Sequence, residues 1–116
     1  MIETIAMVIN GALAAAFVLR RRPKWIAYDP AWLVDAAERQ YPDQPQLVAA
    51  LARCTRACRE SRAYIHFVAP ERPNQPGSEW QFERNLLLEK TAHGTLVLDI
   101  LRDGRVGGVE FLSRLR

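Results

Sequence analysis

The spacing of apolar residues changes character about halfway along the chain. Before residue 63 they recur at intervals of three and four, as in helices, and after it they alternate with polar residues, as in strands. Asp29-Pro30 predicts a helix start, because aspartate caps a helix N-terminus and proline suits the first helical position. Residues 41–45 predict the end of that helix and the start of another. The second of these helices is predicted to carry an apolar stripe of Leu47, Val48, Leu51, Cys54 and Cys58.

Strand signals fill the second half of the chain. Strands are predicted at 63–69, 79–89, 95–102 and 105–112. Asp103-Gly104 predicts a two-residue hairpin turn between the last two. Residues 70–78 contain three prolines, which predicts an extended and stiff loop. Earlier in the chain, residues 24–28 read as either a short strand or a connection.

Helices followed by antiparallel strands predict an α+β fold. We expect one domain over residues 1–116, because 116 residues is the size of a single ordinary domain. Its helical part is predicted over residues 1–62 and its sheet part over residues 63–116. The sheet is expected to be an antiparallel meander of about four strands, with the N-terminal helices packed on one face.

The predicted turn also sets a register for the last two strands. The expected partners are Arg102–Arg105, Ile100–Gly107, Leu98–Val109 and Leu96–Phe111. The apolar face expected beneath the helices consists of Trp80, Phe82, Leu86, Leu88, Leu96, Leu98, Ile100, Val109 and Phe111. The opposite face, where Val106 is also expected, is predicted to be solvated and acidic through Glu83, Glu89, Asp99 and Glu110. Gly107-Gly108 favours a β-bulge, which would change side-chain faces near it.

The first apolar segment admits two interpretations. Residues 4–19 contain no charged residue and are followed by Arg20, Arg21, Arg22 and Lys24. A buried helix with cations near its C-terminus is the favoured interpretation. The alternative is a membrane anchor, although the segment is shorter than the roughly 20 residues that a spanning helix needs.

Charge changes this picture little. The net charge of +3 is too small to indicate a nucleic-acid partner on its own. Arginines recur every third residue on the predicted second helix and next to it: Arg53, Arg56, Arg59 and Arg62. A solvated helix face explains them, and an anion-binding face is the alternative.

The sequence carries no recognisable catalytic or metal-binding motif. Cys54 and Cys58 stand four residues apart, which on a helix is poor disulfide geometry, so we expect buried free thiols in a reducing compartment. His66 is expected within a strand and His93 in a turn, with no nucleophile motif near either. A non-enzymatic protein without cofactor or metal is therefore expected.

The C-terminal third resembles a known group of proteins. Residues 94–101 form an apolar strand with a central Asp99, and residues 103–112 continue through a turn into a Gly-Val-Glu-Phe-Leu strand. With the proline-rich loop and Trp80, this segment resembles immunity proteins of bacterial contact-dependent growth inhibition systems. The resemblance implies a small cytoplasmic, non-catalytic protein. Such a protein binds and blocks the toxin domain of a neighbour's effector, expected here to be a nuclease.

On this hypothesis the toxin contacts an anchoring side chain that is surrounded by charge pairs. The candidate partner-binding residues are Trp80, Glu83, Asp99, Glu110, Glu71, Arg72, Asn74 and Gln75. No small-molecule substrate is expected. Two alternatives remain open, a small nucleic-acid-binding module that uses the arginine-rich helix, and a membrane-anchored small protein.

Overall fold

The computed structural model describes residues 24–115, so the helix or anchor expected at residues 4–19 lies outside the described residues. The described elements are β1 (Trp25–Ala27), α2 (Ala31–Gln40), α3 (Pro45–Ala52), β2 (Arg56–Ser61), β3 (Tyr64–His66), β4 (Phe82–Thr91), β5 (Gly94–Leu101), β6 (Val106–Phe111) and a 3-10 turn, η1 (Leu112–Arg114). The short segment 24–28 therefore contains a strand rather than a mere connection.

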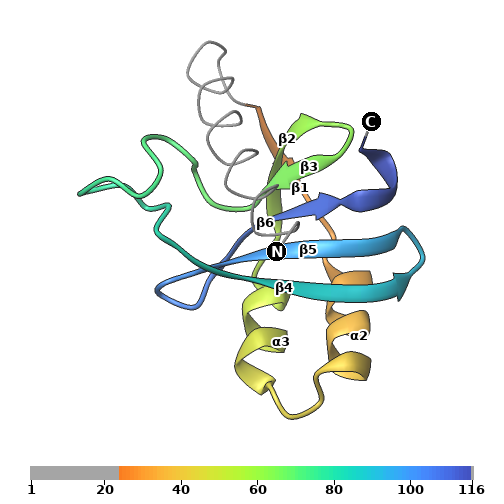
Figure 1. Cartoon of the computed structure of the whole chain (residues 1–116). Coiled ribbons are helices and arrows are strands. Elements are labelled where there is room, and N and C mark those ends of the chain that lie inside the picture. Colours follow the sequence, from red (N-terminus) through yellow and green to blue (C-terminus); the bar gives the residue numbers. More distant parts are fainter. Residues whose placement is uncertain (1–23, 116) are drawn as a thin grey trace.

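The strands form one antiparallel sheet in the order β1-β2-β3-β6-β5-β4, with α2 and α3 side by side against it (Figure 1). This confirms the α+β class. The sheet has six strands where about four were predicted, because β1 and β2 extend it beyond β3. It is also not a simple meander. The loop after β3 carries the chain to the far edge, so β3 pairs with β6, which is the one pairing between strands that do not follow each other along the described chain.

The second helix is shorter than predicted. α3 ends at Ala52 and β2 begins at Arg56, so Cys54 lies after the helix and Cys58 lies on a strand. β2 pairs with β1 on one side and with β3 on the other, and these distant partners replace helical hydrogen bonds. The prediction of an arginine-rich helix face is therefore wrong, because Arg56 and Arg59 lie on a strand. Cys54 and Cys58 are buried and free, as expected.

Helix α2 starts and ends with polar contacts that link it to its surroundings. The Asp29 carboxylate accepts a hydrogen bond from the Ala31 backbone N–H at 3.0 Å, so the helix begins one residue later than Asp29-Pro30 predicted. At its end the Gln40 amide donates to the Glu89 backbone carbonyl and accepts from the Glu89 N–H at 2.9 Å. The Tyr41 hydroxyl donates to the Leu87 carbonyl at 2.8 Å. These contacts cover the outer edge of β4 over its second half.

The β5–β6 hairpin has a three-residue turn instead of the predicted two-residue turn. Leu101 donates its N–H to the Arg105 carbonyl and accepts from the Gly104 N–H, both at 2.9 Å. Gly104 has φ +89°, the left-handed conformation that favours glycine. The ladder then shifts by one residue, as Gly107-Gly108 indicated. Ile100 pairs with Val106 instead of Gly107, whereas Leu98–Val109 and Leu96–Phe111 pair as predicted.

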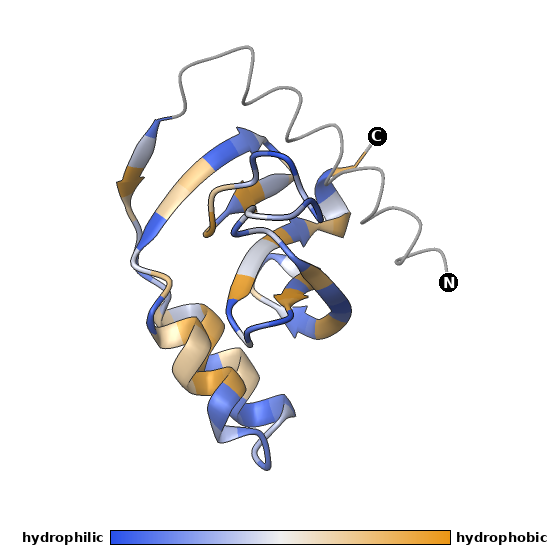
Figure 2. Ribbon diagram, turned by 90° about the vertical axis from the view of Figure 1, so that its left-hand side faces the viewer, coloured by the Kyte–Doolittle hydropathy of each residue, from blue (hydrophilic) through white to orange (hydrophobic). Residues whose placement is uncertain are grey.

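The main core lies between the helices and the sheet. Its buried residues are Leu33, Ala36, Ala37, Leu47, Ala50, Leu51, Cys54, Ala57, Ile65, Leu86, Leu88, Leu96, Leu98, Ile100, Val106, Val109 and Phe111. Figure 2 shows both helices on one side of the twisted sheet, each with apolar and polar segments. Most of the predicted apolar face is confirmed. Val106 joins this core, contrary to prediction, because the shifted ladder turns it toward the helices.

Candidate functional site

A row of polar residues crosses the sheet on the face opposite the helices. The pairing register places His66 of β3 beside Gly108 of β6, Gly108 beside Asp99 of β5, and Asp99 beside Asn85 of β4. Four neighbouring strands therefore contribute one position each. We call His66, Tyr64, Asp99 and Asn85 the polar cluster.

Tyr64 joins this row by leaning across Gly108. Its hydroxyl donates to one carboxylate oxygen of Asp99, and the Asn85 amide donates to the other at 3.1 Å. A Cβ at Gly108 would lie 2.6 Å from the Tyr64 hydroxyl and 2.6 Å from the Ile65 carbonyl. Only glycine at this position leaves room for the tyrosine to reach the aspartate.

The His66 imidazole is packed between aromatic rings. Its centroid lies 4.7 Å from that of Tyr64 and 5.6 Å from that of Trp80, the latter in an edge-on arrangement. The side chain is fully buried, and neither ring nitrogen has a hydrogen-bond partner among residues 24–115. Burial disfavours the charged imidazolium and lowers the pKa of His66 to about 4. The ring is therefore neutral at pH 7.

Burial raises the pKa of the acidic groups on this face of the sheet, opposite to its effect on His66. It raises the pKa of Asp99 to about 7, against the opposing effect of the Tyr64 hydrogen bond. It also raises the pKa of Glu110 above its ordinary value. The pKa of Tyr64 is raised well above 10, by burial first and then by the neighbouring Asp99 carboxylate. Near neutral pH, the Asp99 carboxyl is thus ionised in part of the molecules and protonated in the rest.

The prediction of a solvated, acidic sheet face is wrong for Asp99 and Glu110. Asp99 is 1% exposed and Glu110 is fully buried, so neither presents a carboxylate to solvent. A second apolar cluster occupies this face: Tyr64, Val68, Trp80, Val97 and Leu101, with Phe82, Leu87 and Leu112 at its margin. Only Glu83 and Glu89 of the four predicted carboxylates are exposed.

Trp80 and Phe82 belong to this second cluster instead of the helix-side core. A shift in the β4–β5 ladder between Phe82 and Arg84 changes the side-chain face before that point. Trp80 is 2% exposed and packs closely on Gly107, where a Cβ would lie 2.8 Å from the indole ring. The glycine pair therefore serves two aromatic side chains, since Gly107 accommodates Trp80 and Gly108 accommodates Tyr64.

The loop that begins after β3 is held by its own hydrogen bonds. We call residues 70–79 the proline loop. The Ser78 hydroxyl donates to the Glu71 carbonyl at 2.6 Å, and the Gln81 amide donates to the Gln75 carbonyl at 2.7 Å. The Asn74 side chain accepts from the Phe82 N–H at 2.8 Å.

Positive φ angles at Arg72, Asn74 and Gly77 fold the proline loop back on itself, and it projects from the body of the molecule (Figure 1). Its base is held by the buried Trp80, whose carbonyl accepts from the Asn74 N–H at 2.8 Å. The predicted extended path is therefore wrong, because the loop folds back on itself. Hydrogen bonds within the loop and from Gln81 hold this folded shape.

The predicted partner-binding residues separate into two groups. Asp99, Glu110 and Trp80 are buried, so no partner reaches them in this conformation. The others are Glu71, Arg72, Asn74 and Gln75 on the proline loop, and Glu83 on β4. Sequence reasoning did not single out Tyr64 or Asn85. The one available signal was an aspartate in the middle of an apolar strand beside a glycine pair.

Comparisons with known proteins add no relative. No family model, no curated protein and no solved structure matches the chain.

Within residues 24–115 no group of three or more metal-ligating side chains is present, and no helix is long and apolar enough to cross a bilayer. The proline loop, with its exposed polar tip and buried anchor, is therefore the candidate interaction site.

Proposed function

We propose that this protein is a non-catalytic cytoplasmic immunity protein whose proline loop enters and blocks a cleft of a partner toxin. The observation that carries the proposal is the prefolded state of that loop. A loop already fixed in its bound shape loses little conformational freedom on binding, and this improves affinity. Residues 70–79 have an internal hydrogen bond from Ser78 to Glu71, a further one from Gln81, turns with positive φ and a buried tryptophan at their base.

The chemistry of the exposed tip supports a polar partner surface. Arg72, Asn74 and Gln75 are exposed, and Glu71 is half-buried beside them. A guanidinium, an amide and a carboxylate recognise charged and hydrogen-bonding groups with defined geometry. Glu83 is exposed and follows Phe82, whose N–H donates to Asn74 of the loop. The proposed contact is centred on the loop instead of on the sheet carboxylates.

The decisive experiment expresses the protein encoded next to this one, with and without this chain. We expect the neighbour to inhibit growth alone, and co-expression to restore growth and yield a complex that purifies intact. If the neighbour is neither toxic nor bound, the immunity function is refuted.

A loop variant tests the contact itself. Arg72→Asn combined with Gln75→Ala removes two exposed side chains while keeping a residue that tolerates φ +50° at position 72. We expect the affinity for the toxin to fall about tenfold or more. Arg62→Gln, which removes an exposed charge in the β2–β3 turn, is the matched control and should bind normally. Equal binding by both variants would refute the loop contact while leaving the immunity function to the first experiment.

A further inference from the structure

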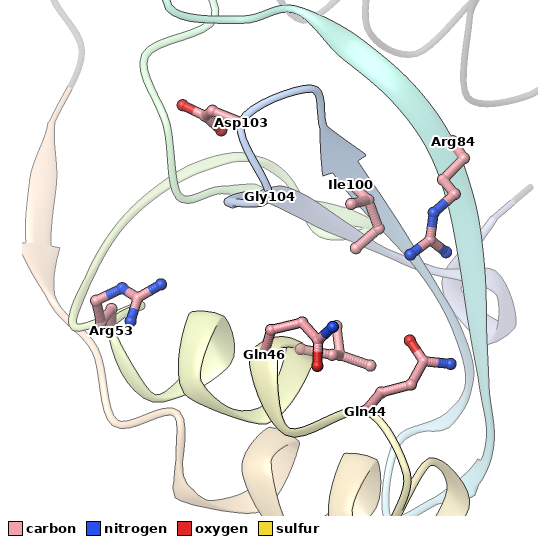
Figure 3. A pocket seen from close by; sticks show the side chains of 8 residues that line it. Gln44, Gln46, Arg53, Arg84, Ile100, Asp103 and Gly104 are labelled. Atoms are coloured by element: carbon pink, nitrogen blue, oxygen red, sulfur yellow. The ribbon is translucent and has the colours of Figure 1, made fainter.

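A pocket of about 210 Å³ lies between α3, the β5–β6 turn and β4. Its lining residues are Gln44, Gln46, Leu47, Arg53, Arg84, Ile100, Asp103 and Gly104. Figure 3 shows the Arg53 and Arg84 guanidinium groups reaching toward the pocket from opposite sides, with Gln46 between them. Neither arginine has an ion-pair partner among the described residues.

The rest of the lining favours negative charge. The first turn of α3 contains no acidic residue, and no side chain caps its N–H groups, so the positive end of the helix dipole is uncompensated. The one carboxylate among the lining residues, Asp103, is paired with Arg105, which also forms an ion pair with Glu79 at 3.0 Å. Arg105 donates its backbone N–H and its Nε to the two Asp103 oxygens, at 3.0 and 2.7 Å, and these bonds lower the pKa of Asp103.

The positive groups stand at two ends of the pocket. Gln44 precedes α3 and Arg53 follows it, and eight helical residues rise about 12 Å. Arg84 projects from β4, where it pairs with Ile100. Between these ends the floor is apolar, because Leu47 and Ile100 are each 5% exposed. A ligand that fits has an anionic group at each end and an aliphatic middle.

Volume limits the size of such a ligand. The volume of the pocket is about 210 Å³. It is smaller than the roughly 300–1,000 Å³ of sites for drug-sized ligands. We infer that this pocket binds a small aliphatic dicarboxylate, held by Arg53 at one end and Arg84 at the other. This inference does not depend on the proposed immunity function.

The test titrates the full chain with glutarate at constant ionic strength and follows backbone amide resonances. Glutarate is expected to bind about tenfold or more tightly than pentanoate, which has the same carbon chain and one carboxylate. Arg53→Gln and Arg84→Gln should each weaken glutarate binding about tenfold. Arg62→Gln removes the same charge at an exposed site outside the pocket, and its affinity should stay within about twofold.

Four results would overturn the inference. They are absence of saturable glutarate binding up to about 20 mM, equal affinity for pentanoate, equal weakening by Arg62→Gln, and equal affinity for inorganic phosphate. The last result would indicate a compact anion site at one arginine instead of a two-ended site. The result of the glutarate titration does not bear on the toxin experiment, so each proposal can be refuted without refuting the other.

Discussion

The polar cluster makes a specific prediction about stability and pH, because two of its members titrate in opposite directions. The pKa of His66 falls from 6.5 to about 4 on folding, so its contribution to stability is fully present above pH 6.5 and is lost as the pH falls through 4. The pKa of Asp99 rises from 3.8 to about 7, so its contribution is fully present below pH 3.8 and is lost as the pH rises through 7.

The magnitudes follow from proton linkage. One proton bound differently by the folded and unfolded states changes the free energy of unfolding by about 1.4 kcal/mol per pH unit. His66 therefore contributes an increase of about 3 kcal/mol between pH 4 and 6.5, and Asp99 a decrease of similar size over the same range. In the wild type the two contributions cancel over this range.

Single variants should remove the cancellation. In His66→Phe, the free energy of unfolding should decline relative to wild type by about 3 kcal/mol between pH 4 and 6.5. In Asp99→Asn it should rise by about the same amount. Urea unfolding followed by circular dichroism at half-unit pH steps measures both, and the slope of the difference from wild type removes the effect of other titrating groups. His93→Gln controls for loss of an exposed imidazole. Variant curves that run parallel to wild type would show that neither group titrates as its burial requires.

Three further predictions concern packing around the sheet. Gly108→Ala should cost about 2–3 kcal/mol of stability in urea unfolding, because its Cβ would meet both the Tyr64 hydroxyl and a backbone carbonyl. Pairing it with Tyr64→Phe should recover only part of that loss, and full recovery would contradict the backbone contact. Tyr64→Phe alone should cost about 1–3 kcal/mol by leaving Asp99 short of a donor. Gln40→Ala should increase self-association, measured by light scattering at high protein concentration, and an unchanged monomer would refute the proposed protection of β4.

Local chemistry explains why some elements were predictable. Asp29-Pro30 and residues 41–45 act on the backbone within a few positions, so α2 and the start of α3 followed from the sequence. The apolar residues that end in Cys58 fit a helix as well as they fit a helix followed by a strand. What decides for a strand is pairing with β1, about thirty residues earlier, and no local signal carries it.

The candidate site shows the same limit. The Tyr64–Asp99 hydrogen bond joins residues 35 positions apart. Asp99 was recognisable as unusual in an apolar strand, but the second apolar cluster on its face includes Trp80, whose side-chain face changed at a shift near Glu83. The loop itself was predictable from its prolines, whereas its hydrogen bonds from Gln81 and Phe82 depend on the three-dimensional path back to β4.

The contacts of Gln40 with Glu89 have a consequence for how the protein behaves in a crowded solution. A primary amide carries an N–H donor beside a carbonyl acceptor, as a peptide group does, so Gln40 occupies the position that a seventh strand would take. The uncovered first half of β4 carries the exposed charges of Glu83 and Arg84, which disfavour pairing with another copy. A ten-residue edge strand that would otherwise template aggregation is thus terminated by one helix-end side chain and two charges.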